Sequence, residues 1–160
     1  MAHQSPERAL QRRQRSTARL NAVQALFQME AAGTPLEDIQ SEFETHRLGA
    51  EVDGITFEEA DRDHFREILS GAVNHQAQID QQTDTSLQAE WPIARIDPTI
   101  RAIFRAALSE ILASDTPAKV VMSEYVDLAR AFFPDGREPG FVNAVLDHAA
   151  KSLRPDIAAN

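Results

Sequence analysis

Four arginines gather near the amino terminus of this 160-residue chain. Within the segment RRQRSTARLNAVQALFQMEAAG, Arg12, Arg15 and Arg19 are spaced i, i+3 and i+7, so a helix would place them on one face. A guanidinium group donates two parallel hydrogen bonds that match a phosphate, and the amino terminus of a helix already favours an anion. The candidate phosphate ligands are therefore Arg12, Arg13, Arg15 and Arg19.

The net charge of −9 conceals an uneven distribution along the chain. The first 20 residues carry five arginines against Glu7, a net of +4, which leaves 11 basic and 24 acidic residues, a net of −13, for the rest. Val23 and Leu26 continue the arginine face as an apolar stripe, so we expect the basic half of this helix to project from an acidic body. Charge alone fits a polyanion-binding end and a disordered basic tail about equally well.

Two phenylalanines are candidates for stacking on unpaired bases. Phe141 falls about 100 degrees off the apolar stripe of the last predicted helix, in its first turn, after a loop that carries Arg137. Such a placement is typical of single-stranded RNA recognition, but a side chain that packs the loop down explains it at least as well. Phe27, next to Leu26 at the flank of the first helix, leaves the same two interpretations open.

Motifs for catalysis or metal binding are lacking in the sequence. The five histidines include no pair at i and i+4 around a glutamate, and the common phosphate-loop, dinucleotide and nucleophile-elbow patterns do not occur. The chain also has no cysteine for a disulfide or a thiolate metal site. We therefore predict a protein that is not an enzyme and that uses no metal and no cofactor.

Helix signals dominate the chain, and they position these candidate residues. Helix caps and apolar stripes of period about 3.6 predict an all-α bundle of about seven helices, with strand signals nearly absent. We expect Gly33 to end the first helix, capping boxes at Thr34 and Thr56 to open the second and third, polar residues from Gln81 to end the third, and Asp97 with Pro98 to open the next. We expect one domain over residues 12–155, built of sub-bundles at roughly 12–82 and 90–155, behind a flexible basic arm at 1–11. No secretory signal or membrane-length apolar run is visible, which favours a cytoplasmic location.

The order of the helical blocks resembles the NusB family. The resemblance rests on ARLNAVQALFQMEAAG, FREILSGAVNH, IRAIFRAALSEIL, TPAKVVMSEYVDLARAFF and FVNAVLDHAAKSLRP, and it covers roughly residues 12–155. It implies a transcription antitermination factor that binds boxA-type single-stranded RNA together with the ribosomal protein NusE. Such a factor helps to load an antitermination complex on RNA polymerase at ribosomal RNA operons.

The resemblance also implies which residues bind. RNA contacts carry over onto Arg12, Arg13, Arg15, Arg19, Phe27 and Phe141. The NusE surface carries over onto the carboxyl-terminal helices, around Glu110, Glu124 and Asp127. Ser16 and Thr17 stand where family members often have arginine, which shifts the expected RNA footprint toward Arg12 and Arg13 and predicts weak RNA binding without NusE.

Two other functions fit a helical bundle of this size. The first is a stand-alone RNA-binding module related to the amino-terminal domain of ribosomal RNA methyltransferases. The second is a DNA-binding regulator that uses TPAKVVMSEYVDLARAFF as its recognition helix, but Lys119 and Arg130 are opposed there by Glu124 and Asp127, a poor surface for a major groove. The sequence leaves open the choice between monomer and homodimer and the bases that are read.

Overall fold

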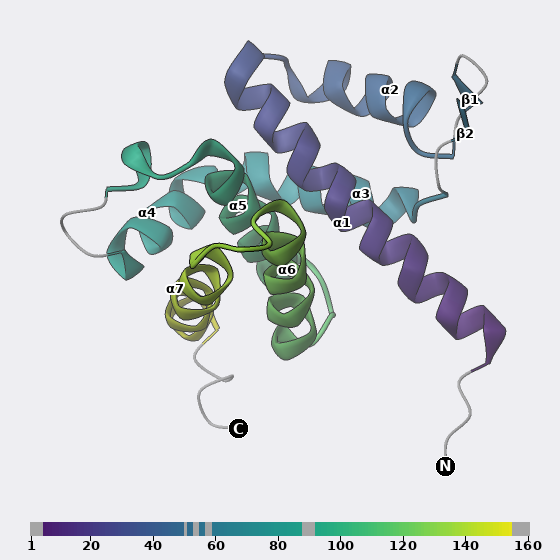
Figure 1. Ribbon diagram of the computed structural model, residues 1–160. Helices are drawn as coiled ribbons and strands as arrows, with labels where there is room; N and C mark the ends of the chain where they lie inside the picture. The colour runs from purple at the N-terminus through teal and green to yellow at the C-terminus, as the bar shows by residue number, and fades with distance from the viewer. Residues whose placement is uncertain (1–4, 50, 53–54, 57–58, 88–91, 155–160) are drawn as a thin grey trace.

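The computed structural model describes residues 5–49, 51–52, 55–56, 59–87 and 92–154, and it confirms the predicted all-α bundle (Figure 1). Seven α-helices, a 3-10 turn and one two-stranded hairpin make up this part of the chain. Their bounds are α1 (Pro6–Ala32), α2 (Leu36–His46), β1 (Glu51–Val52), β2 (Ile55–Thr56), α3 (Arg62–Asn74), α4 (Gln76–Ser86), η1 (Ile93–Arg95), α5 (Pro98–Ala113), α6 (Ala118–Phe132) and α7 (Glu138–Leu153). No helix in the described ranges is both long and apolar enough to cross a membrane.

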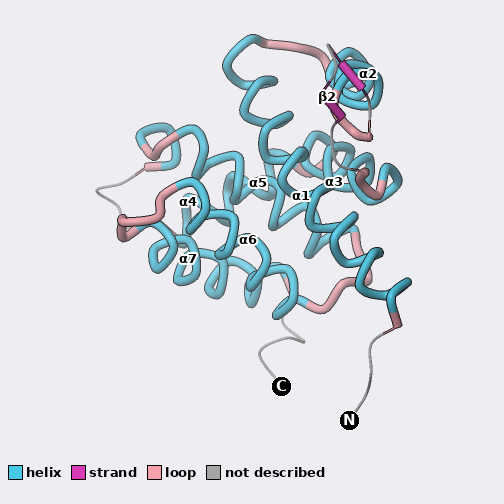
Figure 2. Tube along the Cα trace, turned by 45° about the vertical axis from the view of Figure 1, so that its right-hand side comes forward, coloured by secondary structure: helices cyan, strands magenta, loops and turns pink. Residues whose placement is uncertain are grey.

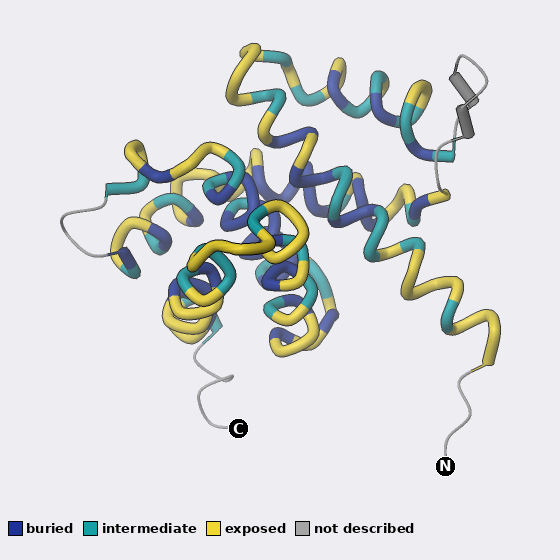
Figure 3. The backbone as a smooth tube through the Cα atoms, in the orientation of Figure 1, coloured by how far each residue is buried: buried dark blue, intermediate teal, exposed yellow. Residues whose placement is uncertain are grey.

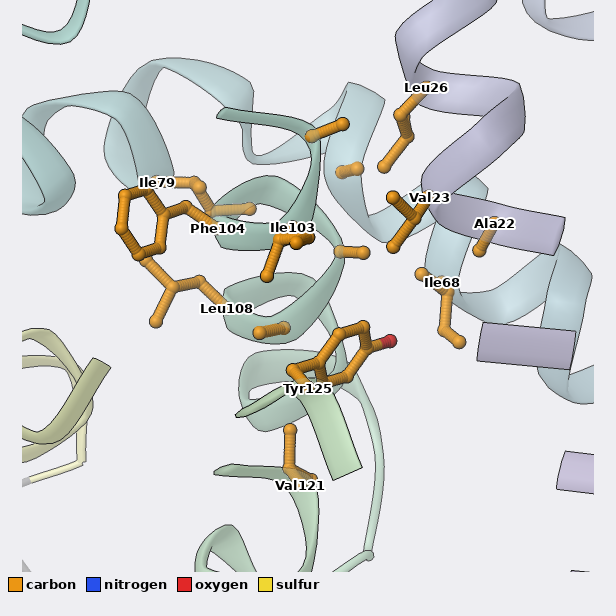
Figure 4. Packing of buried hydrophobic residues seen from close by; sticks show 14 of the residues in the cluster. Ala22, Val23, Leu26, Ile68, Ile79, Ile103, Phe104, Leu108, Val121 and Tyr125 are labelled. Carbon is orange, nitrogen blue, oxygen red and sulfur yellow. The ribbon is translucent and has the colours of Figure 1, made fainter. Parts of the chain in front are cut away.

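Helix α5 is the centre of the bundle, and it contacts α1, α3, α4, α6 and α7. Its capping signal was predicted correctly, because the Asp97 carboxylate accepts the Thr99 amide at 2.7 Å and Pro98 occupies the first turn. Figure 4 shows Ile103, Phe104 and Leu108 of α5 among side chains from the neighbouring helices. Each large apolar side chain buried in this way stabilises the fold by about 1.5 to 3 kcal/mol.

A glycine lets α3 approach α5 closely. Ser109 on α5 donates its hydroxyl to the carbonyl oxygen of Ile68 at 2.7 Å, so the two helices meet through a buried side-chain to backbone bond. A Cβ atom added at Gly71 would lie 2.3 Å from Ser109 Oγ. The contact between the two helices therefore requires a residue without a side chain at position 71.

The first helix begins earlier than predicted. We expected a flexible arm over residues 1–11, but α1 starts at Pro6, and Ser5 caps it by accepting the Arg8 amide at 3.2 Å. Serine before proline is a common helix start, so this signal was present in the sequence and was overlooked. Residues 1–4 lie outside the described part of the chain. The helix ends at Gly33, in the left-handed conformation as predicted (φ 68°).

Two predicted capping boxes do not form. Helix α2 begins after Pro35, and Thr34 makes no cap bond to it. Thr56, expected to open the third helix, instead pairs with Glu51 in a short antiparallel two-stranded sheet. Helix α3 begins only at Arg62.

The predicted third helix is in fact two helices. The chain turns at His75 (φ −115°), where α3 ends and α4 begins, although neither glycine nor proline marks the position. Helix α4 then lies beside α5 and α7, as both Figure 1 and Figure 2 show. The expected boundary of the first sub-bundle near residue 82 is therefore wrong, because α4 packs mainly with the carboxyl-terminal helices.

Candidate nucleic-acid interface

The amino-terminal turns of α1 present arginines to solvent. Arg12, Arg13 and Arg15 are exposed, and Figure 3 shows this end of α1 as largely exposed. Among the described residues, Arg12 and Arg13 form no ion pair, and Arg15 makes only a long one, with Nε 3.7 Å from the Asp61 carboxylate. An exposed pair of this kind contributes little to stability and leaves the guanidinium available to a ligand.

Two grooves flank these turns. The inner groove has a volume of about 550 Å³ and lies between α1, α3, the end of α5 and α6. Its lining includes Arg12, Arg15, Arg19, His64, Glu67, Ser114, Asp115, Thr116 and Glu124. The outer groove, of about 610 Å³, is lined by Pro6, Ala9, Arg12, Arg13, Ser16 and Glu124. The exposed arginines therefore stand on the ridge between two concave surfaces.

Arg19 does not project from the fold, so the prediction that it belongs to an exposed arginine face is wrong. Its side chain is 3% exposed and makes a bidentate ion pair with Glu110 of α5, which is 0% exposed. Nε lies 2.9 Å from Oε1, and Nη2 lies 2.8 Å from Oε2. Arg19 sits one turn before Ala22, on the buried face of α1, and the pair holds that face against α5.

Two more helices join this buried ion pair. Tyr125 of α6 donates its hydroxyl to Glu110 Oε1 at 3.1 Å, and Nε2 of His64 on α3 lies 3.0 Å from Glu110 Oε2. The histidine contact is a close approach rather than a well-aligned hydrogen bond. Burial alone would raise the pKa of Glu110, but the contacts with His64 and Arg19 outweigh it and lower that pKa to about 2. Glu110 thus stays ionised as the link between four helices.

The candidate partner residues fall into different environments. Glu110 is fully buried, so the prediction that it lies on a protein-binding surface is wrong. Asp127 is exposed and pairs with the equally exposed Arg130 at 2.7 Å. Glu124 is 33% exposed and lines both grooves beside the arginines. Asp127 and Glu124 therefore reach the surface of α6, whereas Glu110 does not reach the surface of α5.

Phe141 packs against the core and also lines a groove. One part of the ring packs edge-on against the buried Phe104, with centroids 5.9 Å apart. Phe141 also lines a third groove of about 590 Å³, formed where α4 ends, α5 begins and α7 begins. Apolar side chains such as Leu87, Ile100 and Val145 form much of this Phe141 groove.

Two arginines stand at the Phe141 groove. Arg95 and Arg137 line it, both are exposed, and neither forms an ion pair within the described part of the chain. The sequence pattern indicated Arg137 but not Arg95, which the 3-10 turn η1 brings to the same groove. Asp97 and Glu138 line the same groove, so its charges are mixed. An aromatic ring beside exposed guanidinium groups suits a nucleotide, because a base can stack while a phosphate is bound.

The arginine ridge and the Phe141 groove lie at opposite ends of α5. The inner groove reaches Ala113 at the end of α5, whereas the Phe141 groove reaches Ile100 near its start. The two positions are 13 residues apart along the helix, which corresponds to about 20 Å. Figures 1 and 2 agree that the start of α1 and helix α7 lie on different sides of the molecule. One ligand must be extended to touch both.

Phe27 belongs to neither surface. Its side chain is 41% exposed on the carboxyl-terminal half of α1, and it lines none of the three grooves. One turn further along the helix, Glu30 pairs with Arg101 and Arg105 of α5. This end of α1 is therefore fastened to α5 by ion pairs, and Phe27 stands beside that contact.

Comparison with known proteins identifies the family. The NusB family model matches residues 16–151. The chain is 50% identical over 145 residues to the transcription antitermination protein NusB of Sinorhizobium fredii, which covers 90% of each chain. Its fold is similar to that of T. maritima NusB, with a TM-score of 0.71, 25% identity and coverage of 91% and 96% of the two chains.

A further solved structure shares the fold. It contains the antitermination factors NusB and NusE in complex with double-stranded RNA, and one of its chains matches with a TM-score of 0.66, 23% identity and coverage of 88% and 98%. Family membership also makes the chain a transcription regulator rather than an enzyme, as predicted. The chain belongs to the NusB family of transcription antitermination proteins.

Proposed function

We propose that this protein binds boxA-type single-stranded RNA through the amino-terminal turns of α1, together with the ribosomal protein NusE. The observation that carries the proposal is the exposure of Arg12, Arg13 and Arg15 on a helix end flanked by two grooves. Arginines without strong internal partners can neutralise phosphates, which supplies affinity without sequence preference. Arg19 acts behind them, by holding α1 in place.

The Phe141 groove is the second part of the proposed RNA site. A base that enters it would stack on the exposed part of the Phe141 ring, and its flanking phosphates would meet Arg95 and Arg137. Stacking and contacts with base edges in a shaped groove supply the sequence preference that phosphate contacts lack. An extended strand that runs about 20 Å along α5 would join the two parts, a span that suits an unpaired RNA.

For NusE we propose the surface of α6 and α7. A groove of about 610 Å³ lies between these helices, with Lys119, Met122, Arg130 and Asp147 among its lining residues, and Asp127 is exposed on the same α6. Binding of RNA and of NusE on separate surfaces would convert two weak contacts into one useful affinity. The solved complex of a similar fold with NusE and RNA supports this pairing of ligands.

Further parts of the proposed function follow from the family. We propose that the RNA-bound protein joins an antitermination complex on RNA polymerase at ribosomal RNA operons, and that it works in the cytoplasm, where transcripts emerge. A homodimer that covers the arginine end of α1 would be an inactive storage form. Light scattering with and without RNA checks this, because RNA would dissociate such a dimer.

The proposed function is tested by comparing four labelled ligands in a gel shift. The ligands are boxA single-stranded RNA, a scrambled single-stranded RNA, a double-stranded RNA and duplex DNA, each with and without purified NusE. We expect the boxA strand to bind most tightly and NusE to strengthen that binding. Preferential binding of duplex DNA, or no binding of any RNA in the presence of NusE, would refute the proposal.

A further inference from the structure

A carboxylate lies inside the surface that carries the arginines. Glu124 lines the inner groove with Arg12 and Arg15, and it also lines the outer groove with Arg12 and Arg13. No other acidic residue lines both grooves. A phosphate that approaches any of the three exposed arginines therefore enters the field of this one negative charge.

The fold holds the Glu124 side chain in place. Ser16 of α1 donates its hydroxyl to Glu124 Oε2 at 3.0 Å, and Nη1 of Arg19 lies 3.7 Å from the same oxygen. Only 33% of the side chain is exposed. These contacts with α1 hold the carboxylate beside the arginines, where an anion would bind.

The charges that line the inner groove do not add up to a cationic surface. The positive charge of Arg19 is matched by Glu110 beneath it, which leaves Arg12 and Arg15. Three carboxylates face these two guanidinium groups: they belong to Glu67, Asp115 and Glu124. A groove of this composition attracts phosphate weakly, although the arginines themselves are exposed.

We infer that Glu124 limits the affinity of this protein for RNA, as a fixed negative charge that opposes phosphate binding on both sides of α1. The inference rests on the proposed function, since it concerns the same arginine surface. It makes Glu124 an affinity-setting residue rather than a residue that contacts a protein partner. Neutralising the carboxylate strengthens RNA binding, a gain of function from the loss of a charged group.

The test measures RNA affinity by fluorescence anisotropy with two labelled strands, boxA RNA and a uridine oligomer, without NusE. We expect Glu124→Gln to bind both strands about two- to five-fold more tightly than the unmodified protein at low salt, the effect of one charge a few ångströms from a phosphate in water. The gain should shrink as salt is raised, because exposed charges are screened. Glutamine keeps the shape of the side chain and can still accept the Ser16 hydroxyl.

Two control variants separate the local charge from other causes. Glu37→Gln makes the same change of net charge at an exposed position in the first turn of α2, beyond the far end of the 27-residue α1. Ser16→Ala frees the Glu124 carboxylate to move away from a bound phosphate without removing its charge, so it should strengthen RNA binding less than Glu124→Gln does. Glu37→Gln should bind RNA like the unmodified protein, and thermal unfolding should show that all three variants are folded.

The outcomes distinguish this inference from the proposed function. The inference alone is overturned if Glu124→Gln binds RNA with the same affinity as the unmodified protein. It is also overturned if Glu37→Gln gains as much RNA affinity as Glu124→Gln. A gain in Ser16→Ala as large as that in Glu124→Gln also overturns it, since rearrangement of α1 rather than charge would then explain the effect. No RNA binding by any variant, even with NusE, refutes the proposed function and this inference together.

Discussion

Removal of the Arg19 guanidinium should lower the free energy of unfolding far more than removal of any exposed arginine. In Arg19→Ala, the carboxylate of Glu110 stays fully buried and keeps only Tyr125 and His64 as partners. A buried ion pair that loses one member typically destabilises a protein by about 3 to 5 kcal/mol, because a charge is left in a poorly solvated place. This loss is a large part of the roughly 5 to 15 kcal/mol that is the whole free energy of unfolding of a typical domain.

The depressed pKa of Glu110 gives a second measure of the same interaction. Its value falls from an ordinary 4.5 to about 2 in the folded protein. At about 1.4 kcal/mol for each tenfold change in proton affinity, the partners stabilise the ionised carboxylate by roughly 3 kcal/mol more than burial costs it. His64 and Arg19 share this stabilisation, so we expect Arg19→Ala to lower the free energy of unfolding by about 3 kcal/mol, the lower end of the range for a broken buried pair.

The assay is equilibrium unfolding in urea at neutral pH, with Arg130→Ala as the matched control. Arg130 is 65% exposed, and its pair with Asp127 should contribute less than about 1 kcal/mol. A loss of 3 kcal/mol shifts the urea midpoint by about 1 to 3 M at the slopes usual for small proteins. Equal midpoints for Arg19→Ala and Arg130→Ala would refute the reasoning about the buried pair.

Three further predictions follow from the same contacts. The pKa of Glu110 is lower in the folded protein than in the unfolded chain, so the stabilisation from its ionised form is complete above about pH 4.5 and is lost as the pH falls toward 2. The difference in free energy of unfolding between the unmodified protein and Glu110→Gln should therefore narrow by about 2 kcal/mol between pH 6 and pH 3. A constant difference in urea unfolding would contradict this. Gly71→Ala should destabilise the protein by about 1 to 3 kcal/mol, because the added Cβ would lie 2.3 Å from Ser109 Oγ. At Gly140 an added Cβ would meet no atom within 4 Å, so Gly140→Ala should be neutral or slightly stabilising in the same thermal unfolding experiment. Phe141→Ala should lose the preference for boxA over scrambled RNA. Its loss of stability should be smaller than the roughly 3 to 5 kcal/mol that truncation of a fully buried phenylalanine costs, because only part of the ring packs against Phe104. An unchanged preference in a competition gel shift would leave Phe141 as a packing residue.

The helices could largely be predicted from the sequence because their signals are local. Asp97 with Pro98 and the left-handed Gly33 act within a few residues of where they stand, so the start of α5 and the end of α1 were predicted correctly. The turn at His75 was missed because no local breaker marks it. Helix α4 changes direction there and packs against α5 and α7, a cause that lies outside its own sequence.

The arginine cluster shows where prediction of the site ended. Spacing placed Arg19 with Arg12 and Arg15 on one helix face. Its side chain is buried because it pairs with Glu110, which lies 91 residues further along the chain. A signal did exist: Arg19 stands in the apolar stripe of its own helix, and Glu110 stands among buried residues of α5. One basic and one acidic residue in two core stripes indicate a buried pair, whereas Arg12, Arg13 and Arg15 have no such apolar surroundings.

The central claim is that the exposed arginines of α1 neutralise RNA phosphates, and the salt dependence of RNA affinity tests it most directly. The unmodified protein and a triple variant with Arg12→Ala, Arg13→Ala and Arg15→Ala are titrated with boxA RNA over a range of salt concentrations. For a single strand, each lost phosphate contact lowers the slope of log affinity against log salt by about 0.7. We predict a slope shallower by about 2 and weaker binding by a protein that stays folded, and parallel slopes for the two proteins would contradict the claim.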